Sequence, residues 1–146
     1  MTDTHFLNRP ALTSSGAQAL VDRAVAIAKA KNIAIAASVV DAGGNLMAFL
    51  RMDGVPSVSC DVAIGKARTA AALGAPSEIF ETMINKGETA MLSVAGLYPL
   101  KGGVPILEGG DLAGAVGISG SSGENDMAVA DETAASFAIQ GGFKVA

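Results

Sequence analysis

The sequence IAIAASVVDAGGNLMAFLRM, residues 33–52, contains two apolar runs separated by AGGN. The first run is rich in β-branched residues and alternates with period two, as the strands of a half-buried sheet do. The paired glycines Gly43 and Gly44 are typical of the tight turn that joins two antiparallel strands. The stretch therefore predicts a β-hairpin, and the rest of the chain can be arranged around it.

A second hairpin is predicted at residues 104–119, VPILEGGDLAGAVGIS, with its turn at residues 108–111. Gly114 and Gly117 lie inside the second of its strands. Glycine weakens a strand interior, so its presence there usually marks a bulge or the close approach of another part of the protein. We expect one of these two explanations at each position.

Helices are predicted before, between and after the two hairpins. Thr13, Ser14 and Ser15, followed by Gln18, resemble a capping box at the start of the first helix, and Gly74 is a typical helix stop. Residues 88–100 are ambiguous and could be a fraying helix followed by an irregular loop. The order of elements predicts one α+β domain over residues 1–146, with an antiparallel sheet, packed helices and residues 1–12 as a mobile arm. The predicted helices cover residues 13–32, 57–73, 77–84 and 126–140.

The composition excludes several classes of function. Half of the residues are hydrophobic and the formal net charge is −4, which argues against a sequence-independent grip on nucleic acid or on anionic lipid. The longest strongly apolar run, residues 33–40, is too short to span a bilayer, and the first ten residues do not resemble a signal peptide. Cys60 is the only cysteine, so an internal disulfide is impossible. We expect a cytoplasmic protein.

Five pieces of the chain form a recognisable series. In order, they are VVDAGGNLMAFLRMDG, GKARTA, GGVPI, GDLAGAVGISG and the acidic start of the last predicted helix. Together they resemble the GlcG/HbpS family, and the resemblance extends from the first predicted helix to the last. It implies a profilin-like fold, in which a five-stranded antiparallel sheet is flanked by helices on both faces. It also implies a homo-oligomer connected with small-molecule catabolism and, as in several members, haem as a possible ligand.

The chain departs from the family at the start of that last helix. Members commonly have two adjacent acidic residues there, whereas Asp126 of this chain is followed by Met127. A role that needs both carboxylates is therefore not carried over.

Two cations within the family-like motifs are candidates for ligand binding. Arg51 ends an otherwise apolar strand, and Lys66 lies on an alanine-rich helix. If both side chains entered one cleft, they would form a clamp for a haem propionate or a metabolite carboxylate, because arginine offers a planar fork of donors and lysine a compact charge. The alternative is a structural ion pair, with Asp53, Asp61 or Asp126 as the candidate partners.

Further candidates surround the KGGVPI loop, residues 101–106. Gly102, Gly103 and Pro105 could let backbone N–H groups face a ligand, or they could only form a turn into a strand. Tyr98 could donate a hydrogen bond or ligate ferric iron, although a packing role is the alternative. His5 is the only histidine and could be an axial haem ligand, or a solvent-exposed residue of the arm.

Other catalytic chemistries lack the residues that they need. A serine triad needs a histidine, and the only one lies in the predicted arm. Zinc sites draw on clusters of cysteine and histidine, which the chain does not contain. Cys60 lies near a helix start, but no histidine is close in sequence to act as its base.

Two hypotheses remain open. The first is an oligomer that binds haem, a related tetrapyrrole or another carboxylate-bearing ligand at a subunit interface, through Arg51 and Lys66. The second is a metal-free isomerase, lyase or hydrolase acting on a small organic carboxylate. In the enzyme, Arg51 or Lys66 would orient the substrate and stabilise developing negative charge, and Asp126, or alternatively Glu88, would transfer the proton.

Overall fold

The computed structural model describes residues 4–142, which form four α-helices, one short 3-10 helix and four strands. The strands form one antiparallel sheet in the order β2-β1-β4-β3. Both hairpins predicted from the sequence are confirmed. In chain order the elements are α1 (Ser14–Ala30), β1 (Ala36–Asp41), β2 (Leu46–Arg51), α2 (Val58–Leu73), α3 (Glu78–Asn85), η1 (Thr89–Ser93), β3 (Gly103–Glu108), β4 (Asp111–Ser119) and α4 (Gly123–Gly142).

The sheet has four strands where the family resemblance implied five, and the outer edge of β3 shows why no strand is added there. The backbone N–H of Gly103 donates to Ser77 Oγ at 2.9 Å, and the Gly103 carbonyl accepts from the Ser77 N–H at 3.0 Å. Both outward backbone groups of Gly103 are therefore occupied. Pro105, two residues further, faces the same edge and has no N–H to offer a neighbouring strand.

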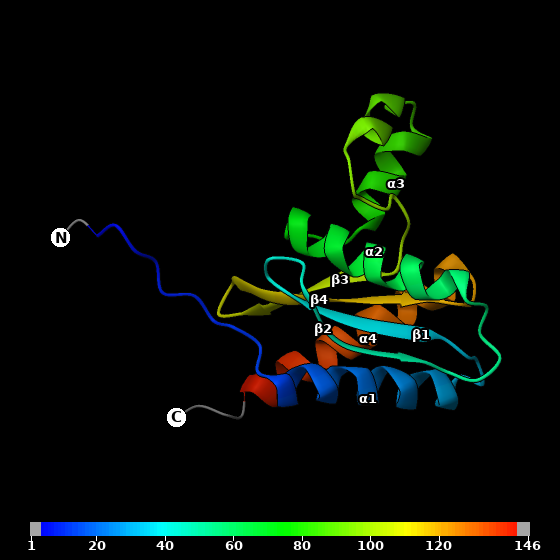
Figure 1. Ribbon diagram of the computed structural model, residues 1–146, viewed down its shortest axis with the longest axis horizontal. Coiled ribbons are helices and arrows are strands. Elements are labelled where there is room, and N and C mark those ends of the chain that lie inside the picture. The colour runs from blue at the N-terminus through cyan, green and yellow to red at the C-terminus, as the bar shows by residue number, and fades with distance from the viewer. Residues whose placement is uncertain (1–3, 143–146) are drawn as a thin grey trace.

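Helix α2 packs on one face of the sheet, whereas α1 and α4 pack together on the other (Figure 1). Side chains alternate between these layers along each strand. Ser38 reaches α2 by donating from its Oγ to the Ala63 carbonyl at 2.8 Å, while its neighbours Ala37 and Val39 enter the main core with residues of α1 and α4. This core is aliphatic and includes Leu20, Val21, Ala24, Ile35, Val116, Ile118, Val129 and Ala130.

The strand glycines allow α2 to approach the sheet closely. A Cβ at Gly117 would lie 2.1 Å from the Ala63 carbonyl oxygen, and a Cβ at Gly103 would lie 2.1 Å from the Lys66 carbonyl oxygen. Close approach of α2, rather than a bulge, is therefore the correct explanation of Gly117 inside β4. At Gly114 both explanations apply: a Cβ there would meet the Val40 carbonyl oxygen and the Leu12 side chain, and the β3–β4 register shifts beside it, between Ile106 and Leu107.

The helix ends follow local hydrogen bonding. Thr13 caps α1 by accepting from the Gly16 N–H at 3.0 Å, but the expected capping box is incomplete because Gln18 bonds to Asp22 instead. Gly74 ends α2 in the left-handed conformation, as predicted. Helix α4 begins at Gly123, three residues earlier than predicted, and the Ser122 hydroxyl accepts from the Asn125 N–H near this start.

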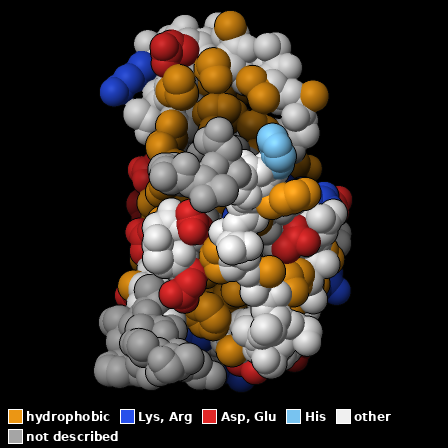
Figure 2. Space-filling view, turned by 90° about the vertical axis from the view of Figure 1, so that its left-hand side faces the viewer, with side chains coloured by type: hydrophobic (Ala, Val, Ile, Leu, Met, Phe, Trp, Pro, Cys, Tyr) orange, Lys and Arg blue, Asp and Glu red, His pale blue; other side chains and the backbone are white. Residues whose placement is uncertain are grey.

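Residues 78–100 form a lobe that extends away from the sheet (Figure 1). Residues 88–100, for which the sequence indicates a fraying helix followed by an irregular loop, contain the short 3-10 helix η1 followed by irregular chain. Hydrophobic side chains gather on the surface of the lobe (Figure 2), where Ile79, Leu92 and Val94 are exposed. No helix within residues 4–142 is both long and apolar enough to cross a membrane.

Candidate functional site

Lys66 and Asp126, the two predicted catalytic residues, form an ion pair with each other. Lys66 Nζ lies 3.2 Å from Asp126 Oδ2 and donates to the Ile118 carbonyl at 2.9 Å. Both side chains are only 4% exposed. Asp126 Oδ1 also accepts from the Ser121 N–H at 3.1 Å. The pair therefore ties α2 to the end of β4 and to the first turn of α4.

The predicted loop glycines enclose this lysine. Gly102 has φ of 126°, and a Cβ there would lie 2.9 Å from Lys66 Nζ and 2.7 Å from the Ile118 carbonyl oxygen. Gly103 lies equally close to the Lys66 backbone. Glycine is needed at both positions because any side chain would occupy the space of the lysine or of its helix.

Burial and mutual attraction act in opposite directions on the pair. Loss of hydration lowers the pKa of the Lys66 ammonium and raises the pKa of the Asp126 carboxyl, whereas the attraction between the two groups opposes both shifts. Just outside, Lys101 Nζ lies 3.4 Å from Glu81 Oε2 and 3.5 Å from Glu124 Oε1. This second set of charges links α3 to α4 over the buried pair.

The remaining predicted residues lie in different surroundings. The Tyr98 ring packs over Gly65 of α2, and the Tyr98 N–H donates to Thr69 Oγ1 at 2.7 Å. Arg51 is exposed at the end of β2 and makes no hydrogen bond or ion pair with the residues described. His5 is exposed on the extended segment before α1. Among the predicted residues, those at positions 66, 102, 103 and 126 are thus brought together.

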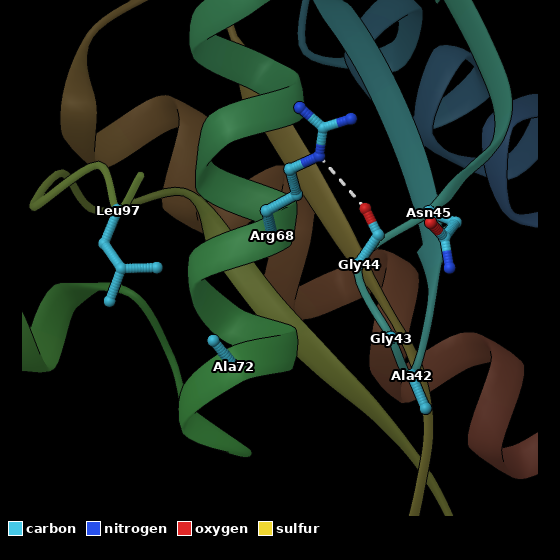
Figure 3. Close-up of a pocket in the computed structure, with 7 residues that line it drawn as sticks. All are labelled: Ala42, Gly43, Gly44, Asn45, Arg68, Ala72 and Leu97. Carbon is cyan, nitrogen blue, oxygen red and sulfur yellow. Dashed lines mark hydrogen bonds between the residues drawn. The ribbon is translucent and has the colours of Figure 1, made fainter. Parts of the chain in front are cut away.

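A pocket of about 380 Å³ lies apart from this ion pair, between α2 and the β1–β2 turn (Figure 3). Arg68 Nε donates to the Gly44 carbonyl at 3.0 Å, which fixes the guanidinium beside the turn. Arg68 is exposed, and no ion pair joins it to a carboxylate within residues 4–142. The lining residues are Ala42, Gly43, Gly44, Asn45, Arg68, Ala72 and Leu97.

Asp41 holds the turn that forms one wall of this pocket. Its Oδ1 accepts from the Asn45 N–H at 2.9 Å and from the Gly43 N–H at 3.0 Å, and the Asn45 side-chain amide adds weaker bonds. The Asn45 N–H and the other donors hold the pKa of Asp41 below its ordinary value, against the opposing effect of burial.

The replacement Asp41→Asn is expected to loosen the turn and lower the Tm by a few degrees at neutral pH, because a charged acceptor of several N–H groups is lost. Since the folded-state pKa of Asp41 is depressed, its contribution is present above the unfolded-state pKa and disappears as the pH falls through the folded-state pKa. Thermal melts between about pH 7 and pH 2 should therefore show the two proteins converging in acid. A difference that stays constant over this range would contradict the assignment.

The comparisons with known proteins identify the family of this chain. The family model described as "Haem degrading protein HbpS-like" matches residues 12–135. The chain belongs to this HbpS-like family. Protein GlcG of Escherichia coli K12 is 36% identical over 108 residues, which are 74% of this chain and 81% of that protein.

Two solved structures show how far the family fold is shared. The Klebsiella pneumoniae protein ORFY superposes with a TM-score of 0.86 at 27% identity, covering 94% of this chain and 97% of ORFY. A PduOC:heme complex superposes with a TM-score of 0.77 at 29% identity, covering 86% of this chain and 94% of that one. The description of the family and the PduOC:heme complex together suggest haem-related binding.

Sequence reasoning missed Arg68, although a signal was present. Arg68 is part of GKARTA, and Ala42, Gly43, Gly44 and Asn45 are part of VVDAGGNLMAFLRMDG, so two of the family-like motifs form opposite walls of one pocket. The separation of about 20 residues between the two motifs in the sequence does not show how far apart they lie in space. Only the packing of α2 beside the turn shows that they meet.

Proposed function

We propose that this protein binds a small carboxylate-bearing organic ligand, haem or a related tetrapyrrole among them, in the pocket between the β1–β2 turn and α2. The observation that carries the proposal is Arg68, an arginine fixed at Nε by the Gly44 carbonyl and without a carboxylate partner among residues 4–142. An arginine fork binds carboxylates with two parallel charge-assisted hydrogen bonds. The volume of the pocket lies within the range of small-molecule sites.

The lining residues fit the carboxylate of a ligand better than the iron of a haem. The two glycines and two alanines leave space without side-chain bulk, and Leu97 adds an apolar surface. None of the seven lining residues is a histidine, cysteine, tyrosine or methionine, which are the side chains that commonly ligate haem iron. A haem at this site would therefore be held by its propionates, and an axial ligand would come from outside the lining set.

The residues predicted from the sequence remain proposals for this function. Arg51 could supply a second cation, and an interface between subunits could bring it or His5 to the ligand of a neighbouring copy. For Lys66, the bonds to Asp126 and Ile118 already occupy its ammonium, and Gly102 and Gly103 pack around it. Pro105 and Tyr98 are half-buried against neighbouring chain segments. We therefore assign the first contact with the ligand to Arg68.

The alternative, a metal-free enzyme in which Asp126 transfers a proton beside Lys66, also remains a prediction. Its support is the opposing pKa shifts of the two groups, which are common at functional sites but also occur in structural ion pairs. Side chains that are 4% exposed offer a substrate little access. This burial favours the binding function over the enzyme.

A titration with hemin tests the binding proposal. The wild-type protein should give a saturable shift of the Soret band, and Arg68→Gln should weaken binding about tenfold, because a charge-assisted bidentate contact contributes on the order of 1.5–3 kcal/mol. The matched control is Arg23→Gln, which removes an exposed arginine from α1, remote from the pocket lining. It should bind as the wild type does.

A second titration uses hemin dimethyl ester, whose carboxylates are blocked. It separates the loss of the contact between Arg68 and a ligand carboxylate from any general effect of the substitution on binding. We expect the ester to bind the wild-type protein and Arg68→Gln equally. The proposal fails if hemin gives no saturable shift, or if Arg68→Gln binds hemin as tightly as the wild type. The same titrations with Arg51→Gln show whether the arginine predicted from the sequence takes part.

A further inference from the structure

The two edges of the sheet differ in whether they can accept another strand. At β3, Ser77 occupies the outward backbone groups of Gly103, and Pro105 removes the next outward N–H. Sheet proteins often block their edges in this way, because an open edge can pair with another chain. The β3 edge is therefore closed.

The β2 edge has none of these protections. Residues 46–50, LMAFL, contain no proline, glycine or charge, and Arg51 carries the first charge after the turn. Leu46 is 46% exposed and Leu50 is 38% exposed. Helix α2 lies over β1, β4 and β3 rather than over β2, so one face of this strand also stays open beside the helix.

The register shows which backbone groups of β2 are free. The Met52 N–H donates to the Ile35 carbonyl at 2.9 Å, and antiparallel pairing alternates from there, so Leu50 and Ala48 face β1. The N–H and C=O groups of Phe49 and Arg51 point away from the sheet. The irregularity between Val39 and Val40 lies at the turn end of the hairpin and leaves this segment in regular pairing.

We infer that β2 pairs with β2 of a second copy of this chain, antiparallel across a two-fold axis. The segment is suited to contact with itself: it carries no charge, so two copies of an acidic protein meet without like charges opposed. A pairing centred on Phe49 exchanges both outward bonds of that residue, sets Leu50 opposite Ala48 of the second copy, and sets Arg51 opposite Met47 rather than Arg51.

The closed β3 edge also limits the size of this assembly. Pairing of β2 with β3 would repeat without end and build a filament, whereas pairing of β2 with β2 uses the sheet edge that is open within residues 4–142 and stops at two copies. Self-association was expected from the sequence. The difference between the two sheet edges adds which strand mediates it and why this pairing ends at two copies. The inference does not depend on the ligand.

Light scattering coupled to size-exclusion chromatography tests this pairing. The wild-type protein at about 20 µM should include a unit of about 29 kDa, twice the chain mass of 14.5 kDa. Leu50→Lys and Leu46→Lys should each shift the mass towards 14.5 kDa, because a lysine on an edge strand opposes pairing. The matched control is Leu107→Lys on β3, where the leucine is 46% exposed like Leu46, and this variant should keep the wild-type mass.

Circular dichroism establishes that each variant is folded, and either of the two β2 variants is sufficient if the other does not fold. A monomeric wild-type protein would overturn the inference. The β2 edge would then be available for pairing with a peptide of another protein. A folded Leu50→Lys or Leu46→Lys of unchanged mass would also overturn it, as would dissociation caused by Leu107→Lys.

Discussion

Replacement of Gly117 by alanine is expected to remove most of the stability of the fold. The new Cβ would lie 2.1 Å from the Ala63 carbonyl oxygen and 2.6 Å from the Ala67 backbone nitrogen, both of them backbone atoms of α2. A helix backbone cannot move aside as a side chain can, so α2 would have to lift from the sheet. The lift would also break the bond from Ser38 Oγ to the Ala63 carbonyl, which is buried.

The expected cost exceeds that of ordinary overpacking, which is about 1–3 kcal/mol. We expect a loss of about 4 kcal/mol or more, which is a large part of the 5–15 kcal/mol typical of a folded domain. Thermal unfolding followed by circular dichroism should show a Tm at least about 10 °C lower, or no cooperative transition.

Gly43→Ala provides the matched control. Gly43 does not adopt the left-handed conformation, and its nearest neighbours would be side-chain atoms of Asn45 and Asp41 at 3.2 and 3.4 Å. The Tm of this variant should change by only a few degrees. If Gly117→Ala melted within a few degrees of the wild type, the close packing of α2 on β4 would be wrong.

The two hairpins could be predicted because local sequence determines them, whereas Gly117 indicated either a bulge or a close approach without deciding between the two. Alternation and a glycine-containing turn restrict a strand pair within about 20 residues, as residues 33–52 do. A glycine inside a strand suggests that there is no room for a side chain at that position, but it does not identify the neighbouring group. The closure of the β3 edge against a further strand could not be predicted locally, because it depends on Ser77, which is 26 positions from Gly103.

The candidate site was harder to predict because it depends on contacts between distant residues. Asp126 was among the possible partners of Lys66, but these residues are 60 positions apart, and no local pattern distinguishes that pairing from one with Asp53 or Asp61. Arg68 was missed for a related reason: on a helix it looks like any exposed cation. Its significance comes from the Gly44 carbonyl, 24 positions earlier, which holds it beside a pocket.

Replacement of Asp126 by asparagine is expected to destabilise the protein by about 3–5 kcal/mol at pH 7, because it leaves the Lys66 ammonium buried without its counter-charge. The double variant Lys66→Met, Asp126→Leu should recover much of this loss, since a buried ion pair can often be replaced by apolar side chains at little cost. Urea unfolding of the single and double variants measures both effects. Asp131→Asn, at an exposed carboxylate further along α4, is the matched control and should change stability little.

The pH dependence of Asp126→Asn distinguishes a buried charge from a packing defect. Burial already lowers the pKa of Lys66 below its ordinary value near 10.5, and removing the carboxylate takes away the attraction that opposes this shift. Between the folded-state and unfolded-state pKa values the unfolded chain binds more protons, so the stability of the variant should rise with pH across that window. Urea unfolding at pH 7 and at about pH 9.5 should therefore show the gap to the wild type narrowing in alkali. A constant gap would mean that the aspartate acts through its hydrogen bond to Ser121 rather than through the charge of the lysine.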